Sequence, residues 1–339
     1  MSAPPDKIDN GNANNAQITQ EDFTKKVSRG LTTFTSGTLL VVIGFAVGAL
    51  IILFDYFPLR PEDSSFIQTS SFQLFLLATI AQTVFWAVAF GSMWPSLRTL
   101  TEYGKGHVPE LITWSLLFAT LIYSSRFFAV SCKYSLHHHG LKTGLLTVLG
   151  GVVAIMAALG TILVNIGLRE VLANSSHSMG NSHDVTIESK QADLVKEYLY
   201  LRGRLLLFLS ILGMMLGLVT LAQSAKRYLI IKSPITTCDE TVFTVGKVIV
   251  FGLYYTLILA LTFLPTFSLL ITTGHKLRDD IIPIPSPHND AWESACSKRR
   301  KLEKLLALSV TESLRALIAI LAPVIGSLAS LVEWANKRM

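Results

Sequence analysis

Six long apolar runs constrain the fold of this chain more than any other feature of its sequence. Each run is close to the roughly 20 residues that an α-helix needs to cross the hydrocarbon core of a bilayer. Only 15% of the 339 residues are charged, whereas soluble domains carry about 25%. The sequence therefore predicts an all-α fold, a polytopic membrane helix bundle with about six transmembrane helices. The expected spans cover residues 34–54, 72–94, 111–130, 145–168, 205–222 and 248–271.

The chain divides into three parts by composition. Residues 1–30 are polar and nearly free of large apolar side chains, which predicts a disordered cytoplasmic tail without a cleavable signal peptide. Residues 31–274 contain the expected transmembrane bundle, in which Pro95 should end the second span and Gly274 should cap the sixth. Residues 275–339 are expected to form a cytoplasmic C-terminal helical region.

Two segments outside the spans are expected to form amphipathic cytoplasmic helices. Residues 187–204 repeat apolar side chains at helical spacing and run into the fifth span without a strong helix breaker. One helix should therefore leave the membrane there, with an apolar stripe that needs a partner. After the proline-rich connector 283–287, residues 290–293 have the spacing of a capping box and predict the start of a second helix.

The distribution of Lys and Arg predicts the orientation. If the N-terminus is cytoplasmic, 11 basic residues of the tail and inner loops and 10 after Gly274 lie inside, which makes 21 of 29. The sequence thus predicts an integral, multi-pass membrane protein with both termini in the cytoplasm. The inner group includes Lys298, Arg299, Arg300 and Lys301, which either fix the topology or contact anionic lipid or a soluble cytoplasmic partner.

The apolar stretch 314–334, near the end of the chain, has three possible roles. It carries a broad apolar face and, beside it, a line of small residues that includes Ala322 and Gly326. Small residues four apart allow two helix backbones to approach closely. Packing against the bundle or another subunit is therefore favoured, and the alternatives are an interfacial helix or a seventh span.

Small residues at this spacing recur in the expected spans and predict close helix packing. They permit a homo-oligomer without requiring one. The candidate packing or oligomerisation residues are Gly44, Gly48, Gly150, Ala154, Gly213, Gly217, Ala322 and Gly326.

The sequence offers few groups for chemistry. The expected spans contain almost no carboxylates, which disfavours coupled proton or sodium transport. No HExxH, GxSxG, P-loop or GxGxxG motif occurs, so we predict no enzymatic activity and no cofactor. The run His137–His139 and the three separated cysteines lack the spacing of metal sites, and no nucleic-acid motif is evident. Arg126, Ser125, Gln82 and Asn165 are candidates for a pore or solute path.

Three functions fit these patterns. The first is an oligomeric pore or membrane-perturbing effector, gated through the cytoplasmic helices. The second is a membrane anchor or scaffold for a soluble partner, and the third is a passive transporter of a neutral or anionic solute. The sequence favours the first only slightly over the second.

Overall fold

The computed structural model describes residues 39–50, 69–124, 139–178, 186–232, 244–284, 292–306, 308 and 317–328. Across these residues the chain is helical and contains no strand, in agreement with the predicted all-α fold. The helices are α3 (Ser70–Leu100), α4 (Val108–Ser124), α5 (His139–Ser178), α6 (Thr186–Lys232), α7 (Val245–Ile281) and α8 (Trp292–Leu305), with two shorter helices at Leu39–Leu50 and Leu317–Leu328.

Four of these helices are long and apolar enough to cross a membrane, which supports the predicted membrane class. Their apolar segments are Phe72–Leu100, Gly144–Ser175, Lys190–Ile231 and Val245–Ile281. The predicted number of six spans is not confirmed. Of the expected span 34–54 only residues 39–50 are described, and α4 has 17 residues, with 125–130 outside the described part.

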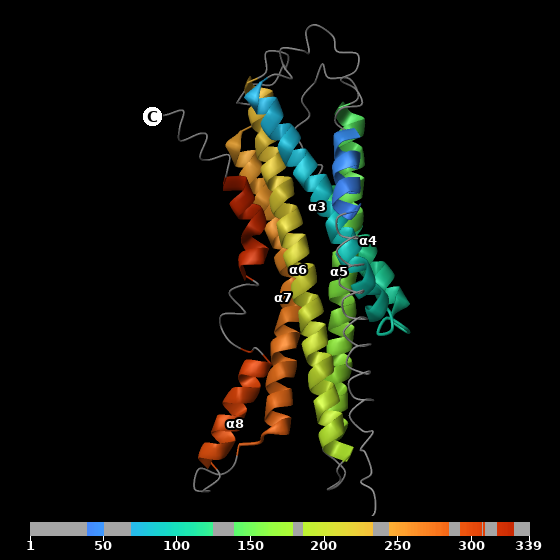
Figure 1. Ribbon diagram of the computed structural model, residues 1–339, viewed down its shortest axis with the longest axis vertical. Helices are drawn as coiled ribbons and strands as arrows, with labels where there is room; N and C mark the ends of the chain where they lie inside the picture. The colour runs from blue at the N-terminus through green and yellow to red at the C-terminus, as the bar shows by residue number, and fades with distance from the viewer. Residues whose placement is uncertain are drawn as a thin grey trace, which may run out of the picture.

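The bundle is built around three long helices that lie side by side along the long axis (Figure 1). The chain descends through α5, returns through α6 and descends again through α7. Helix α3 packs against α5 and α6, α4 packs against α5, and α8 lies against the lower end of α7. Large side chains fill the space between the helices, among them Trp86, Met93, Tyr198, Phe208 and Phe263, each at most 5% exposed.

The exposed side chains change character along α7. From Val250 to Leu264 they are mostly apolar, and the next exposed positions after Pro265 are Ser268, Thr272 and Asp279. Since α6 has 47 residues, or about 70 Å of helix, it greatly exceeds the roughly 30 Å hydrocarbon core of a bilayer. We define the projecting region as residues 169–178, 186–204, 268–281 and α8. The remaining helical residues of the bundle, whose exposed side chains are mostly apolar, form the lipid-facing region.

Two predicted helix ends are wrong. Pro95 lies inside α3, which continues to Leu100, because membrane helices tolerate proline where neighbouring groups satisfy the freed backbone. Gly274 does not cap α7, which continues to Ile281. A Cβ atom at Gly274 would lie 2.6 Å from the Tyr198 hydroxyl oxygen and 2.7 Å from Leu308 Cδ2. This glycine therefore permits close packing of α7 against α6.

Candidate functional site

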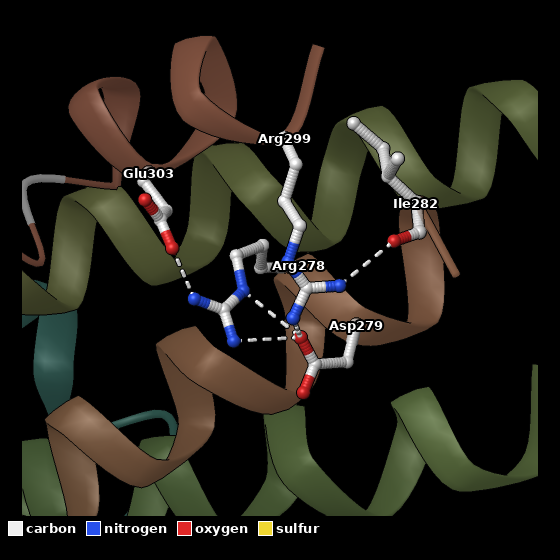
Figure 2. Close-up of polar contacts among 5 residues, drawn as sticks. All are labelled: Arg278, Asp279, Ile282, Arg299 and Glu303. Atoms are coloured by element: carbon white, nitrogen blue, oxygen red, sulfur yellow. Dashed lines mark hydrogen bonds and ion pairs between the residues drawn. The ribbon is translucent and has the colours of Figure 1, made fainter. Parts of the chain in front are cut away.

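A cluster of charged side chains joins α8 to the lower end of α7 (Figure 2). Arg278 Nε donates to Asp279 Oδ1 at 2.9 Å, and its Nη1 atom donates to Glu303 Oε1. Arg299 donates through Nη2 to the same Asp279 oxygen and through Nη1 to the Ile282 carbonyl oxygen at 3.1 Å. The two arginine side chains are only 13% and 15% exposed. These bonds fix the position of α8 on α7.

The sequence of α8 explains which side faces α7. Trp292, Cys296, Arg299 and Glu303 are partly buried and recur every three or four residues, so they share one helix face. The opposite side is the basic face, which we define as the exposed residues Lys298, Arg300, Lys301 and Lys304. The predicted contact group Lys298–Lys301 is therefore divided, because Arg299 is held in the ion-pair cluster and the other three bases are free of α7.

A pocket of about 760 Å³ borders the basic face. Arg300, Lys301 and Lys304 contribute positive charge to its wall and Glu293 contributes negative charge, whereas the carboxylate of Glu303 is paired with Arg278. Trp292 contributes a large flat surface that an apolar side chain can contact. The described lining residues are Trp292, Glu293, Cys296, Ser297, Arg300, Lys301, Glu303, Lys304 and Leu308.

The basic face stands away from the lipid-facing region. The partners of α8 on α7 are residues 278–282, which follow Ser268 by 10 to 14 residues, or about 15 to 21 Å of helix. Charges interact strongly with a surface only within about a Debye length, near 8 Å at physiological salt. Because the headgroup layer extends about 5 to 8 Å beyond the hydrocarbon core, these α7 residues lie about one to two Debye lengths outside the headgroups, where salt weakens attraction to lipid.

The turn between α3 and α4 is anchored to α6. Tyr103 donates its hydroxyl hydrogen to Glu197 Oε1 at 2.9 Å. Burial raises the pKa of Tyr103 above its ordinary value, and the hydrogen bond to the Glu197 carboxylate raises the pKa further. The protonated phenol is thus the form that the folded protein favours at neutral pH.

The candidate path residues do not come together within the described part of the chain. Asn165 donates to Thr266 Oγ1 at 3.2 Å, whereas Gln82 is buried one turn from Trp86. Trp86 packs on Gly150, which precedes Asn165 by 15 residues, or about 22 Å along α5. Arg126 and Ser125 lie outside the described residues. Many buried hydroxyls, including those of Thr79 and Thr161, donate to carbonyls of their own helix.

The small residues in the first half of the chain contact other helices of the same chain. A Cβ atom on Gly44 would lie 2.8 Å from Val84 Cα, and one on Gly48 would lie 2.1 Å from Thr83 Oγ1, both in α3. A Cβ atom on Gly150 would lie 2.8 Å from the Trp86 ring. Ala154 is 4% exposed and belongs to the core. These residues are thus already used within one copy of the chain.

The same holds for the C-terminal small residues. A Cβ atom on Gly213 would lie 2.4 Å from the Ala319 carbonyl oxygen, one on Gly217 would lie 3.3 Å from that of Ala322, and one on Gly326 would lie 2.5 Å from that of Gly217. Helix Leu317–Leu328 therefore packs closely on α6 and runs parallel to it. Its other side carries the exposed residues Leu317, Ile318, Leu321, Ile325 and Leu328.

The ion-pair cluster is not predicted by the sequence patterns. By sequence, Arg278 is one of the basic charges beyond the last span, and Glu303 is an ordinary residue of a polar helix. A signal does exist in the spacing of Arg299 and Glu303, which places a basic and an acidic group on the same face of α8. Within the described residues, no group of three or more His, Cys, Asp or Glu side chains is placed to hold a metal ion.

Comparison with known protein families, curated proteins and solved structures finds no match to this chain. The class of the protein therefore follows from its own features. Four long apolar helices, with apolar side chains on their outer surfaces, are compatible with a membrane protein and suggest insertion into a bilayer.

Proposed function

We propose that this chain is a membrane anchor that docks an acidic soluble partner on the basic face of α8. The observation that carries this proposal is the division of the basic group. Arg299 and Arg278 hold α8 in place, and Lys298, Arg300, Lys301 and Lys304 remain exposed. A fixed basic surface is expected to attract an acidic protein surface and to steer its approach.

The distance from the lipid-facing region favours a protein over lipid as the partner. The residues of α7 that hold α8 lie about 15 to 21 Å beyond Ser268, which is about one to two Debye lengths outside the headgroup layer, so salt weakens attraction to lipid headgroups. The distribution of Lys and Arg favours the cytoplasm as the side on which α8 stands.

The anchor is favoured over the oligomeric pore because the small residues that permit a pore are occupied in packing a single chain. Gly44, Gly150, Gly213 and Gly326 make their close contacts inside one copy. Gln82 and Asn165 are far apart along the bundle, so they do not support a common solute path.

The test uses the full-length protein in nanodiscs of neutral lipid and a fluorescent peptide of ten glutamates as the probe. The variant replaces all four bases of the basic face with Glu. The matched control makes the same change to Glu at four exposed bases elsewhere, which are Arg98, Lys105, Lys190 and Lys196. We expect salt-sensitive binding by the wild type and the control, and a loss of at least about tenfold in affinity for the variant, since several charge contacts are removed.

Equal binding by the variant and the wild type would contradict the docking proposal. A second set of nanodiscs, made with anionic lipid and the probe omitted, tests the lipid alternative. If the basic-face variant alters the mobility of spin labels on α8 only when anionic lipid is present, lipid rather than protein is the partner.

A further inference from the structure

A second positively charged group lies between α6 and α3. Arg204 Nη1 donates to Ser96 Oγ at 2.8 Å, and the guanidinium carbon lies 4.9 Å from the centroid of the Tyr200 ring. The Nε atom of Arg204 is buried and has no hydrogen-bond partner. Among the described residues, no carboxylate forms an ion pair with this arginine. The contacts of Arg204 with described residues are therefore made with neutral groups, which do not neutralise its charge.

The contacts within the described part of the protein therefore satisfy only part of the hydrogen-bonding capacity of Arg204 and leave its charge unpaired. Burying a charge is costly unless it is paired and hydrogen-bonded, and a guanidinium has five N–H donors in a planar fork. Ser96 is 1% exposed and bonds Arg204 from inside the bundle, whereas Arg204 itself is partly exposed. The hydroxyls of Thr99 and Tyr200 bond each other beside it, and Thr99 is exposed. Thr99 Oγ1 also donates to the Ser96 carbonyl oxygen at 2.9 Å, so these hydroxyls must exchange their present bonds before either donates to an anion. Arg204 itself keeps N–H donors that no described group accepts, so an anion arriving from the surface finds a guanidinium ready to donate.

The position of Arg204 along the long axis of the bundle indicates which class of anion is available to it. On α3, the exposed and stacked rings of Phe90 and Trp94 lie toward the lipid-facing region. Just beyond them Arg98 and Glu102 are exposed, where α3 ends. Exposed Trp followed by exposed charges is typical of the boundary between acyl chains and headgroups. Ser96, the partner of Arg204, lies between Trp94 and Arg98 and hence at this boundary.

We propose that Arg204, with Ser96, Thr99 and Tyr200, forms a binding site for the phosphate group of a membrane lipid. Arginine suits phosphate because its fork donates two parallel hydrogen bonds to two phosphate oxygens. The bound phosphate would supply the negative charge that the protein does not, and it would tie α3 and α6 to the surface of the bilayer. The site is independent of the proposed docking on α8, so either proposal stands if the other fails.

The test measures ligand-dependent thermal stability of the full chain, purified in a maltoside detergent and stripped of lipid. Three ligands are titrated: phosphatidylglycerol, a galactolipid without phosphate, and inorganic phosphate. The wild type should be stabilised by phosphatidylglycerol only. Arg204→Gln should weaken the apparent affinity by about tenfold or more, because a charge-assisted hydrogen bond is lost. The matched control is Arg98→Gln, an exposed arginine near the same height, which should behave as the wild type.

Two outcomes overturn the proposal. The first is an equal response of Arg204→Gln and wild type to phosphatidylglycerol, and the second is equal stabilisation by the galactolipid. Equal stabilisation by inorganic phosphate would overturn the assignment to lipid. If Arg204→Gln does not fold, native mass spectrometry of the wild type and Arg204→Lys replaces it. The wild type should retain phosphatidylglycerol in preference to galactolipid, and Arg204→Lys should retain less; no preference in the wild type overturns the site.

Discussion

The lipid-facing region and the projecting region are held together by different forces. In the first, glycines let helices approach and large rings fill the gaps, as at Gly160, where a Cβ atom would lie 2.4 Å from the Phe208 ring. In the second, Arg278, Arg299 and Glu303 form bonds between helices. The difference follows from the surroundings. Lipid provides no hydrophobic driving force for helix association, so close van der Waals packing must stabilise the helices there, whereas ionic groups outside the membrane are readily solvated by water.

The sharpest prediction concerns the helix Leu317–Leu328, which belongs to the lipid-facing region although it follows α8. Its parallel course along α6 and its apolar outer side predict that the chain's end lies on the side of the membrane opposite α8. The Lys and Arg distribution predicts instead that the chain's end and α8 lie on the same side of the membrane. The two predictions are distinguished by an epitope tag after Met339 and a cysteine at exposed Ser297, whose accessibility is measured in sealed vesicles. Each site is expected to be labelled from one side only. Labelling of both from one side would contradict the crossing.

The next largest effect is expected where packing alone holds the helices. Gly160→Leu places a branched side chain into the fully buried Phe208 ring, and we expect a loss of about 3 kcal/mol in the free energy of unfolding or failure to assemble. Gly203 lies in α6 with nothing within 4 Å of a Cβ position, so Gly203→Leu is the control and should be near neutral. Thermal unfolding in detergent measures both. Equal losses in the two variants would show that close packing at Gly160 is unimportant.

A smaller effect is expected at the ion-pair cluster. Arg278→Gln removes bonds to Asp279 and Glu303, whose carboxylates are 51% and 39% exposed, so solvent already weakens the attraction. We expect a local loss of about 1 kcal/mol, release of α8 from α7 and unchanged melting of the bundle. Limited proteolysis between α7 and α8 reports the release, and Lys298→Gln, on the basic face, serves as the control. Unchanged cleavage in Arg278→Gln would mean that other contacts hold α8.

The smallest effect concerns pH at the boundary between the two regions. Because the folded protein raises the pKa of Tyr103, the stabilising contribution of this phenol is complete below the ordinary tyrosine pKa of about 10 and is lost as the pH rises above it. The wild type should therefore lose more stability than Tyr103→Phe between pH 9 and 11. With solvent screening we expect a difference below about 1 kcal/mol. A Tyr103→Phe variant with an identical pH profile would exclude this contribution.

The sequence predicts the helical class well because apolar runs of 20 residues have few alternatives in a folded chain. It fails at helix ends, where Pro95 and Gly274 have the local propensity to stop a helix but lie in helices that tertiary packing extends. It does not predict the bond between Arg278 and Glu303, 25 residues apart, because partners on different helices leave no periodic signal. The same reason applies to Arg204, since its partner Ser96 is 108 residues away.

The uninterrupted course of α6 has a mechanical consequence. Since α6 is one continuous helix of 47 residues, we expect a force on the part near Glu197 to tilt or rotate the part that packs against Leu317–Leu328. Forces applied by the proposed partner outside the membrane would thus be transmitted along α6 to the lipid-facing region.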